Sequence, residues 1–393
     1  MFKILLVHNY LRPPSGENVV YESEKRLLLE KGHKIITYER NNKEITSYSF
    51  INKSTLPLKV VWARDSYKKI ANLIKKHKPS LVHFHNTFPL ISPTAYRVCY
   101  KYHIPIVQTL HNYRMICPGA LLFRNGKICE DCITGSLWNA VKHKCYHDSC
   151  LQTSIVASMI YIHRLLKTWD MITVYIALNE FCKSIFIKAG LKKDRIFIKP
   201  NFIPNNYIPS FTHNNFAIFI GRLSREKGLY TLLNAWRSIK NLSLKIIGEG
   251  PMKEELKKWR LTNVEIMGYL PKTQTLKLLK QAYFLVLPAE CYETFSLVVH
   301  EAFACGKPVI ASRLGILSKV IKDKVTGLLF EPGNVNDLVE KIKWMINHKA
   351  EAIEMGKRAR VEFEDKYIAD KNYELLMDIY QKAIEINKKE HGF

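Results

Sequence analysis

Two glutamates, Glu293 and Glu301, bracket the segment E-T-F-S-L-V-V-H-E, and a helix is predicted to start between their two carboxylates. The apolar run Tyr283–Leu287 predicts a buried strand just upstream. Thr294 and Ser296 can each accept an N-cap hydrogen bond, so a helix is predicted to begin beside them. Glu293 is therefore expected at a strand-to-helix turn, on the edge of a parallel sheet where open α/β folds bind ligands. Glu301 would lie roughly 80° round a helix from Glu293, so the two are expected to have different roles. The alternative is a pair of solvated surface glutamates.

A second segment, Gly221–Gly228 (G-R-L-S-R-E-K-G), has the composition of an anion site. It follows a predicted strand, Phe216–Ile220, and precedes a helix predicted from Leu229. Glycine permits close backbone approach, a helix N-terminus offers unpaired N–H groups, and Arg222 and Lys227 supply two cations. These features together predict a site for a diphosphate. Another glycine turn, G-E-G-P at Gly248–Pro251, follows the next predicted strand and again precedes a helix.

The amino-terminal part predicts a βαβ unit and two histidine-bearing strand ends. A strand over 2–7, a helix from Gly16 through Glu30 and a strand over 34–38 predict a parallel sheet. Gly16 is interpreted as allowing a substrate close to the helix N-terminus, with a simple tight turn as the alternative. His111 directly follows the predicted strand 106–110. A neutral imidazole there could accept a hydrogen bond from a sugar hydroxyl, and a structural histidine is the alternative.

An insertion rich in cysteine follows His111. Its spacing, C-x11-C-x2-C-x12-C, resembles structural zinc ligation, although a second C-x-x-C pair is missing. The alternative is a set of reduced, partly buried thiols. The four cysteines of this hypothesis are Cys117, Cys129, Cys132 and Cys145.

Composition indicates a globular enzyme of two or three domains. The chain has 393 residues, and 60 Lys and Arg against 35 Asp and Glu give a net charge of +25. Such an excess attracts phosphorylated substrates, anionic membranes or nucleic acid, but no Lys/Arg block reads as a nucleic-acid tail. No signal peptide or membrane span is expected. Residues 151–168 predict an amphipathic helix that packs on the core or, alternatively, docks shallowly on a membrane. Residues 43–66 are predicted to be irregular, and Pro200–Pro209 is predicted to be a linker containing Asn205 and Asn206.

With these motifs in this order, the chain resembles the glycosyltransferase group 1, or family 4, enzymes of GT-B fold. The resemblance covers essentially the whole chain and includes S-G-E-N-V-V near Gly16, T-L-H-N at His111 and K-P-N-F-I before the second domain. It implies an α/β architecture in which two Rossmann-like domains face each other across a cleft. The implied divisions are 1–203 for the acceptor, with an insertion at 115–150, then 210–368 for the nucleotide sugar. Residues 369–393 would form a helix that crosses back to the first domain.

The resemblance also implies residue roles. Arg222 and Lys227 would clamp the donor diphosphate, Glu301 would bind the ribose hydroxyls, and Glu293 would bind the donor sugar. His111 would lie beside the transferred sugar, and Gly16 would contribute to acceptor binding. The remaining donor contacts would come from Gly221, Gly248, Glu249, Phe295, Ser296 and Leu297.

The implied reaction is retaining transfer from a nucleotide-diphosphate sugar to a glycan or lipid-linked acceptor of cell-surface polysaccharide. Charge that develops on the leaving diphosphate would be stabilised by Arg222 and Lys227, so no catalytic metal is expected. The protein is expected in the cytoplasm, peripherally at an anionic membrane face, without a nucleic-acid partner. Two alternatives stay open: the same fold acting on a soluble acceptor, and a non-catalytic binding protein.

Overall fold

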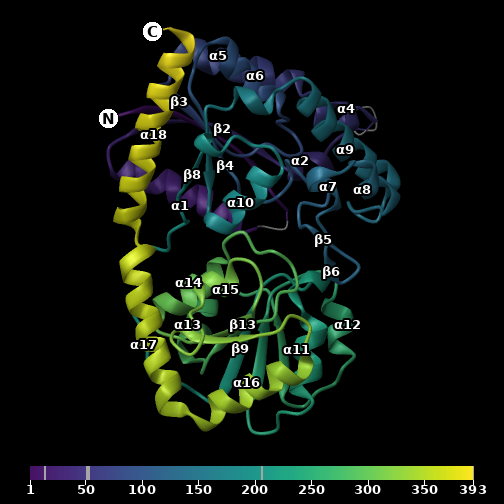
Figure 1. The fold of residues 1–393 in the computed structure, drawn as a ribbon, viewed down its shortest axis with the longest axis vertical. Helices are drawn as coiled ribbons and strands as arrows, with labels where there is room; N and C mark the ends of the chain where they lie inside the picture. The colour runs from purple at the N-terminus through teal and green to yellow at the C-terminus, as the bar shows by residue number, and fades with distance from the viewer. Residues whose placement is uncertain (13–14, 50–53, 205–206, 393) are drawn as a thin grey trace. The chain divides into compact units, whose positions relative to one another are not determined.

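The computed structural model describes residues 1–12, 15–49, 54–204 and 207–392, which divide into two compact units. The first unit contains Met1–Leu122, Cys129–Asn201 and Asp370–Phe393. The second contains Phe123–Ile128 and Phe202–Ala369. Each unit has its own parallel sheet, so the chain has two separate α/β cores (Figure 1).

The sheet of the first unit has strand order β2-β1-β3-β4-β7-β8, and every neighbouring pair is parallel. Its central strands read as continuous apolar runs because helices cover both faces, and β3 is buried at every position. The strands are β1 (Lys3–Tyr10), β2 (Lys34–Asn41), β3 (Leu81–Asn86), β4 (Ile106–Thr109), β7 (Val174–Ala177) and β8 (Ile196–Ile198).

Helices connect these strands. The longer ones are α1 (Gly16–Glu30), α5 (Arg64–His77), α6 (Thr94–Lys101), α9 (Cys150–Leu165) and α10 (Glu180–Lys188). Shorter helices are α2 (Lys43–Thr46), α4 (Leu56–Val61), α7 (Asp131–Thr134), α8 (Trp138–Lys142) and the 3-10 helices Trp169–Met171 and Lys193–Arg195. The amphipathic helix predicted near 151–168 is therefore present as α9.

The prediction that 43–66 is irregular was wrong. That segment contains α2, α4 and the start of α5, while its residues 50–53 lie outside the described chain. The physical reason is tertiary packing: Val60 of α4 is buried against Val156 and Ile160 of α9. A six-residue helix has little intrinsic stability, so its sequence signal was weak and this contact decides its structure.

Helix α18 (Ala369–His391) packs on the core of the first unit, as predicted. Leu376, Ile379 and Tyr380 are buried in one apolar cluster with Ile4 and Leu6 of β1. The last helix is thereby fixed to the first sheet by hydrophobic burial, although the chain has passed through the second unit before reaching it.

The sheet of the second unit has order β11-β10-β9-β12-β13-β14, again entirely parallel. The strands are β9 (Phe216–Ile220), β10 (Ser243–Ile247), β11 (Val264–Gly268), β12 (Leu285–Leu287), β13 (Val309–Ser312) and β14 (Gly327–Phe330). Its helices are the 3-10 helix Arg225–Lys227, α11 (Leu229–Trp236), α12 (Lys253–Lys257), α13 (Lys272–Gln281), α14 (Leu297–Ala304), α15 (Leu317–Val320), α16 (Val335–Asn347) and α17 (Lys349–Lys366). The predicted α/β class with two parallel Rossmann-like sheets is confirmed.

Part of the predicted linker is packed on the fold, although Pro204 and Ile208 are exposed. Phe202, Ile203 and Tyr207 are buried, and the Ile203 amide donates to the Tyr367 carbonyl at 3.1 Å. Asn205 and Asn206, which belonged to the same prediction, lie outside the described residues. A small antiparallel hairpin of β5 (Phe123–Arg124) and β6 (Lys127–Ile128) groups with the second unit.

Candidate functional site

Three loops of the second unit carry most of the predicted donor-site residues. They follow β10, β9 and β12, which are neighbours in the sheet, so parallel pairing brings all three loops to one edge. Chain order reverses there, because β10 lies on one side of β9 and β12 on the other. Open α/β sheets bind ligands at such a reversal, outside the carboxyl ends of the strands.

Two glycines allow the loops to approach one another. Gly228 has φ +68°, and a Cβ on it would lie 1.8 Å from the carbonyl oxygen of Pro288. Gly248 has φ +146°, and a Cβ on it would lie 1.8 Å from the carbonyl oxygen of Gly221. Any other residue would clash with backbone at either position, and the left-handed φ of Gly228 disfavours a side chain as well.

Backbone hydrogen bonds then fix the loops. The Leu223 amide donates to the Glu249 carbonyl at 2.9 Å, and the Glu290 amide donates to the Glu226 carbonyl at 2.9 Å. The first bond joins the loops after β9 and β10, and the second joins the loops after β9 and β12. Groups held this way need little rearrangement on ligand binding, which favours affinity.

Lys227 and Glu293 meet at the centre of this edge. Lys227 Nζ lies 2.5 Å from Glu293 Oε1, and the two side chains are 21% and 12% exposed. Burial alone would lower the pKa of Lys227, but the Glu293 carboxylate outweighs it and raises that pKa above its ordinary value. The ammonium is therefore charged at neutral pH and is aimed at the same place as the carboxylate.

Arg222 and Glu249 lie at the exposed margin of the same edge. The Arg222 side chain is exposed and forms no ion pair within the described chain, so its guanidinium can turn towards an anion. The Glu249 carboxylate accepts from Lys253 Nζ at 2.6 Å and from the Tyr269 amide at 3.1 Å. Its contribution to the edge is the carbonyl bonded to Leu223 rather than a free carboxylate.

Helix α14 starts differently from the prediction. Ser296 occupies the N-cap position, but its backbone is left-handed at φ 54° and its side chain makes no cap hydrogen bond. The Ser296 carbonyl instead accepts from His300 Nδ1 at 3.0 Å, and the His300 ring stacks on Phe295 at 4.0 Å. Burial lowers the pKa of His300 to about 4, so its neutral ring holds the turn. Leu297 begins the helix, whose first amides lack partners within the helix and face the loop.

Glu301 lies one turn into α14 and is 5% exposed. Burial raises the pKa of its carboxyl, and an ion pair with Lys272 of α13 acts in the opposite direction. Lys272 was not singled out from the sequence. Its partner is distant in the chain, and nothing in its local segment distinguishes it from the other surface lysines.

In the first unit, His111 directly follows β4 and belongs to a buried row of histidines. His111 Nε2 lies 3.0 Å from His85 Nδ1, and the two rings stack at 5.1 Å. Burial, followed by the nearby His85 and His8, lowers the pKa of His111 well below its ordinary value. His111 is therefore a neutral imidazole at neutral pH.

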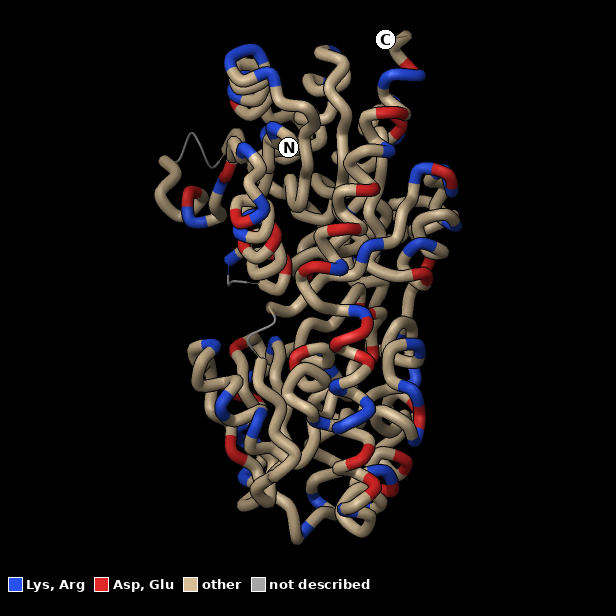
Figure 2. Tube along the Cα trace, turned by 90° about the vertical axis from the view of Figure 1, so that its left-hand side faces the viewer, with Lys and Arg blue, Asp and Glu red and all other residues tan. Residues whose placement is uncertain are grey.

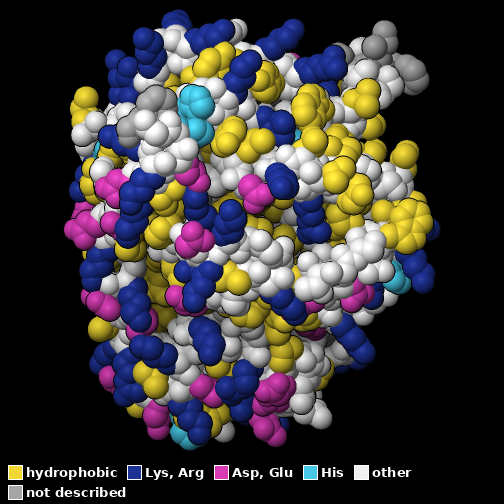
Figure 3. Space-filling model, turned by 45° about the horizontal axis from the view of Figure 1, so that its top comes forward, with side chains coloured by type: hydrophobic (Ala, Val, Ile, Leu, Met, Phe, Trp, Pro, Cys, Tyr) yellow, Lys and Arg dark blue, Asp and Glu magenta, His cyan; other side chains and the backbone are white. Residues whose placement is uncertain are grey.

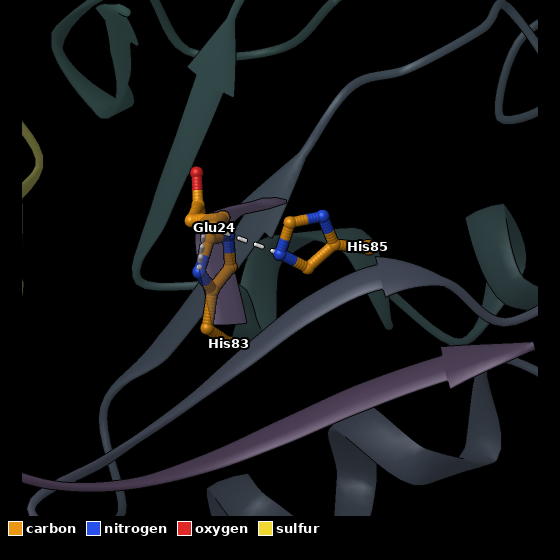
Figure 4. Close-up of side chains that lie close together, drawn as sticks. All are labelled: Glu24, His83 and His85. Atoms are coloured by element: carbon orange, nitrogen blue, oxygen red, sulfur yellow. Dashed lines mark ion pairs between the residues drawn. The ribbon is translucent and has the colours of Figure 1, made fainter. Parts of the chain in front are cut away.

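The histidine row ends on a buried ion pair that the sequence did not reveal (Figure 4). Glu24 Oε2 lies 2.7 Å from Lys199 Nζ, and Glu24 Oε1 lies 3.2 Å from both His83 Nδ1 and His85 Nε2. Burial opposes ionisation of Glu24, but Lys199 and the two histidines hold its pKa well below the ordinary value. Neither Glu24 Oε1 nor His85 Nε2 forms a hydrogen bond within the described chain, so their contact is electrostatic.

Glu24, His83 and His85 are also the one group of three potential metal ligands among the described residues. Lys199 already occupies the second oxygen of the carboxylate, and the Lys199, Glu24 and His83 side chains are almost completely buried. A divalent cation would add charge beside that ammonium without a path from solvent. The chemistry of this group fits a structural network better than a metal site.

Gly16 opens α1 and is exposed. The adjacent Glu17 receives a hydrogen bond from Asn112 Nδ2 at 2.5 Å, which ties the start of α1 to the residue after His111. Burial raises the pKa of Glu17, and its Oε2 has no partner within the described chain. Glu17 is thus a further polar group at this sheet edge. The S-G-E-N-V-V string contained it, but sequence reasoning assigned only the glycine.

The predicted zinc ligands do not form a metal site in this structure. No three sulfur atoms among Cys117, Cys129, Cys132 and Cys145 lie within 4.8 Å of one another in the described chain. Cys132 is buried in an apolar cluster with Val156 and Ile160. Burial, followed by the neighbouring Cys117 thiol, raises the pKa of Cys132 to about 12. The zinc prediction is therefore not supported.

Two family models match consecutive parts of the chain. The model described as glycosyltransferase family 4 matches residues 16–206, and the model described as glycosyl transferases group 1 matches residues 206–362. The boundary between them falls near Asn201 and Phe202, where the structure divides into its two units.

Individual relatives agree with these models. The uncharacterised glycosyltransferase MJ1178 of Methanocaldococcus jannaschii is 30% identical over 51% of this chain and 58% of its own length, so the match spans less than two thirds of that relative. An uncharacterised 42.6 kDa protein in the cps region of Klebsiella pneumoniae is 26% identical over 81% of this chain and 87% of its own. The crystal structure of Anabaena Alr3699/HepE in complex with UDP-glucose superposes with a TM-score of 0.68 at 15% identity, covering 97% of this chain and all of that one.

Proposed function

The chain belongs to the glycosyltransferase group 1 and family 4 enzymes of GT-B fold, and on that premise we propose that it transfers a glycosyl group from a nucleotide-diphosphate sugar. The proposed acceptor is a growing cell-surface polysaccharide or its lipid-linked precursor. The relative in a cps region supports this acceptor class, and the UDP-glucose bound by the Anabaena protein supports a uridine nucleotide as the first donor to test.

One observation carries the proposal: the contact between Lys227 and Glu293 at the reversal point of the second sheet. An ammonium suits a diphosphate, and a carboxylate suits sugar hydroxyls. Because the two side chains are in contact, a ligand that binds both must carry a phosphate close to sugar hydroxyls. In a nucleotide-diphosphate sugar the diphosphate is bonded directly to the sugar. Its phosphates would bind Lys227, and its sugar hydroxyls would bind Glu293.

The other residues extend this assignment. Arg222 adds a second cation for the diphosphate, and Gly221 and Gly248 let the backbone approach it. Glu301 accepts from the ribose hydroxyls, and the amides at Phe295–Leu297 hold the donor. Negative charge develops on the diphosphate as the anomeric bond breaks, so cations preorganised there stabilise the transition state more than the ground state. No residue is assigned as a covalent nucleophile, and attack by the acceptor on the face that the leaving group vacates accounts for retention.

In the first unit, His111 is assigned to the transferred sugar and Gly16 to the acceptor. A neutral imidazole can accept a hydrogen bond from a sugar hydroxyl through the ring nitrogen that carries no proton. Because burial lowers the pKa of His111, this role would persist below the pH at which an ordinary histidine becomes cationic.

A peripheral membrane surface accords with a lipid-linked acceptor. Exposed apolar side chains gather among Lys and Arg over the upper part of the face in Figure 3. In the first unit the exposed apolar residues of α4, α8 and α9 include Leu58, Trp138, Leu151, Tyr161 and Leu165. Figure 2 shows Lys and Arg spread along the trace of each unit. Within the described residues, no helix has the length and apolar character needed to cross a bilayer.

A ligand screen tests the donor assignment. Purified protein is titrated with nucleotide-diphosphate sugars, starting with uridine derivatives, in buffer with EDTA, and melting temperature and heat of binding are recorded. A true donor at 100-fold excess over its Kd should stabilise the fold by about 2.7 kcal/mol. Lys227→Ala should abolish most of the shift, whereas Lys240→Ala, an exposed lysine of the same unit, should leave it intact. Equal shifts in both variants would contradict the site.

Vesicle flotation separates the acceptor classes. Recovery with vesicles that contain anionic lipid, reduced by replacing Tyr161 and Leu165 with Ser, supports the membrane-bound acceptor. Recovery only in the unbound fraction favours the alternative, a transferase acting on a soluble acceptor. Donor binding without transfer to any polysaccharide precursor would favour a non-catalytic binding protein.

A further inference from the structure

A cavity of about 230 Å³ lies in the first unit, away from the residues assigned above. Its walls come from Met115 and Ile116, the carboxyl end of α9, the 3-10 helix Trp169–Met171, the segment Ala189–Arg195 and the end of α18. Ile172 and Arg195 stand just before β7 and β8, so these two lie at the amino ends of the strands. His111 and Gly16 are not among the lining residues.

Two residues that line this cavity carry buried hydrogen-bond donors without partners. Arg164 Nη2 and Trp169 Nε1 are both inaccessible to solvent, and neither has a hydrogen-bond acceptor within the described chain. Leaving such donors unsatisfied costs about 1–3 kcal/mol each, and more for a charged group. Burial also lowers the pKa of Arg164, the nearby Cys132 thiol acting in the opposite direction. A side-chain rotation that turns either donor into the cavity would let a bound oxyanion remove its penalty.

The charged groups of the cavity also favour an anion. Arg195 forms an ion pair with Glu390, so the charges of these two side chains cancel. Of the remaining lining residues, Arg164, Lys167 and Lys192 are cationic and Asp170 is anionic. No carboxylate of the described chain forms an ion pair with any of the three cations. The cavity therefore keeps a net positive charge that its own protein groups do not neutralise.

We propose that this cavity is a binding site for a phosphate group. After such a rotation the oxygens of a phosphate can accept from the Arg164 guanidinium or the Trp169 indole, while Lys167 and Lys192 contribute charge. The volume is below the about 300–1,000 Å³ of pockets that enclose drug-sized ligands, so it suits a phosphate with a small substituent. The group can be the head of a lipid or a free phosphate. Leu165 and Leu166, exposed beside Arg164, would contact the acyl region in the first case.

The test uses three variants of the full chain. Arg164→Gln removes the guanidinium, Trp169→Phe removes the indole N–H but keeps the aromatic bulk, and Lys142→Gln removes an exposed, unpaired charge of α8 outside the cavity. In the first arm, inorganic phosphate is titrated calorimetrically against chloride at constant ionic strength. In the second arm, flotation compares phosphatidylcholine vesicles containing phosphatidic acid with vesicles containing oleic acid, which is anionic but lacks a phosphate.

Arg164→Gln and Trp169→Phe should each weaken phosphate binding by about tenfold or more, while Lys142→Gln should match the wild type. If the two cavity variants bind inorganic phosphate more weakly in the first arm, free phosphate is sufficient to occupy the cavity. If the two variants lose flotation only with vesicles that contain phosphatidic acid, and not with vesicles that contain oleic acid, the ligand is a lipid phosphate. If both cavity variants bind like Lys142→Gln in both arms, the proposal is overturned. Phosphate bound at the Arg222–Lys227 loop is common to all three variants, so this outcome is independent of the proposed transferase activity. If Arg164→Gln fails to fold, Trp169→Phe still tests the proposal, because it keeps the aromatic packing and removes only the indole N–H.

Discussion

Lys227 Nζ and Glu293 Oε1 lie 2.5 Å apart, although the two residues are separated by 66 positions in the chain. They come from the loops after β9 and β12, which are adjacent strands of the second sheet. The pair keeps both side chains extended towards the edge before a ligand arrives. A donor then replaces one charge-assisted contact with two, without first ordering a flexible lysine.

Replacing Lys227 with Ala should lower kcat/KM for glycosyl transfer or donor hydrolysis by about 10²–10³-fold. The reason is that the ammonium acts where charge develops on the leaving diphosphate. Arg222→Ala should act in the same direction, because Arg222 also faces the diphosphate in the proposed assignment. Steady-state kinetics with the identified donor measures both, with Lys240→Ala as the control. Unchanged turnover in both site variants would refute their assignment as diphosphate ligands.

The affinity of the nucleotide should depend on the ionisation of Glu301. Burial raises the pKa of this carboxyl, so it becomes protonated at a higher pH than an exposed glutamate and then accepts ribose hydroxyls less well. Affinity should therefore fall as the pH is lowered through that raised pKa. Lys272→Met removes the group that lowers the pKa, and the loss should begin at a still higher pH. Calorimetric Kd values across pH test this, and identical pH profiles for the wild type and Lys272→Met would contradict the coupling.

Gly228→Ala should destabilise the second unit by several kcal/mol. A methyl group on residue 228 would lie 1.8 Å from the Pro288 carbonyl oxygen. The backbone there is also left-handed, which strains any residue with a side chain, so overpacking adds to the backbone strain. Gly32→Ala is a matched control, because Gly32 has φ +82° but no atom within 4 Å of the added Cβ. Its cost should be about 1–2 kcal/mol from strain alone. Urea unfolding of both variants separates the two contributions, and equal losses would show that the loop after β12 can move away.

Glu24→Gln should cost about 3–5 kcal/mol at neutral pH, because it leaves the Lys199 ammonium buried without its counter-ion. The double variant Glu24→Gln with Lys199→Met should recover part of that loss, since no uncompensated charge remains. Thermal unfolding of the two single variants and the double variant gives the coupling energy. Strictly additive losses would argue against a paired charge.

The same network predicts a pH dependence with a definite sign. The folded-state pKa of Glu24 lies well below its ordinary value of 4.5, so its contribution to stability is complete above about that pH. The contribution disappears as the pH falls through the lowered folded-state value. The difference in unfolding free energy between wild type and Glu24→Gln should accordingly stay constant from pH 7 to about 4.5 and shrink below it. A difference that shrank already near pH 6.5 would point to the histidines instead of Glu24.

Much of the second unit could be predicted from local pattern. The strand predicted over 216–220 matches β9 at both ends, and the helix predicted from Leu229 begins there as α11. Continuous apolar runs between glycine turns are strong signals because a parallel strand is buried on both faces. The sequence pattern did not predict strand β14 or helix α10, and it predicted irregular structure where α4 lies. These are short elements with few turns or residues, so packing partners rather than local pattern stabilise them.

Chain order and residue type were sufficient to identify Lys227, Glu293, Glu301 and His111 as candidate ligand-binding groups. Glycine turns and strand ends can be recognised from a few neighbouring residues. The partners of two of these groups came only from the three-dimensional arrangement: Lys272 for Glu301 and His85 for His111. The buried pair of Glu24 with Lys199 was not indicated by the sequence at all. The same holds for the unpaired Arg164 and Trp169 donors and for the separation of the cysteine sulfurs. Backbone propensity and burial patterns act over a few residues, whereas charge pairing and cavities depend on distances between segments far apart in the chain. Only the folded packing fixes those distances.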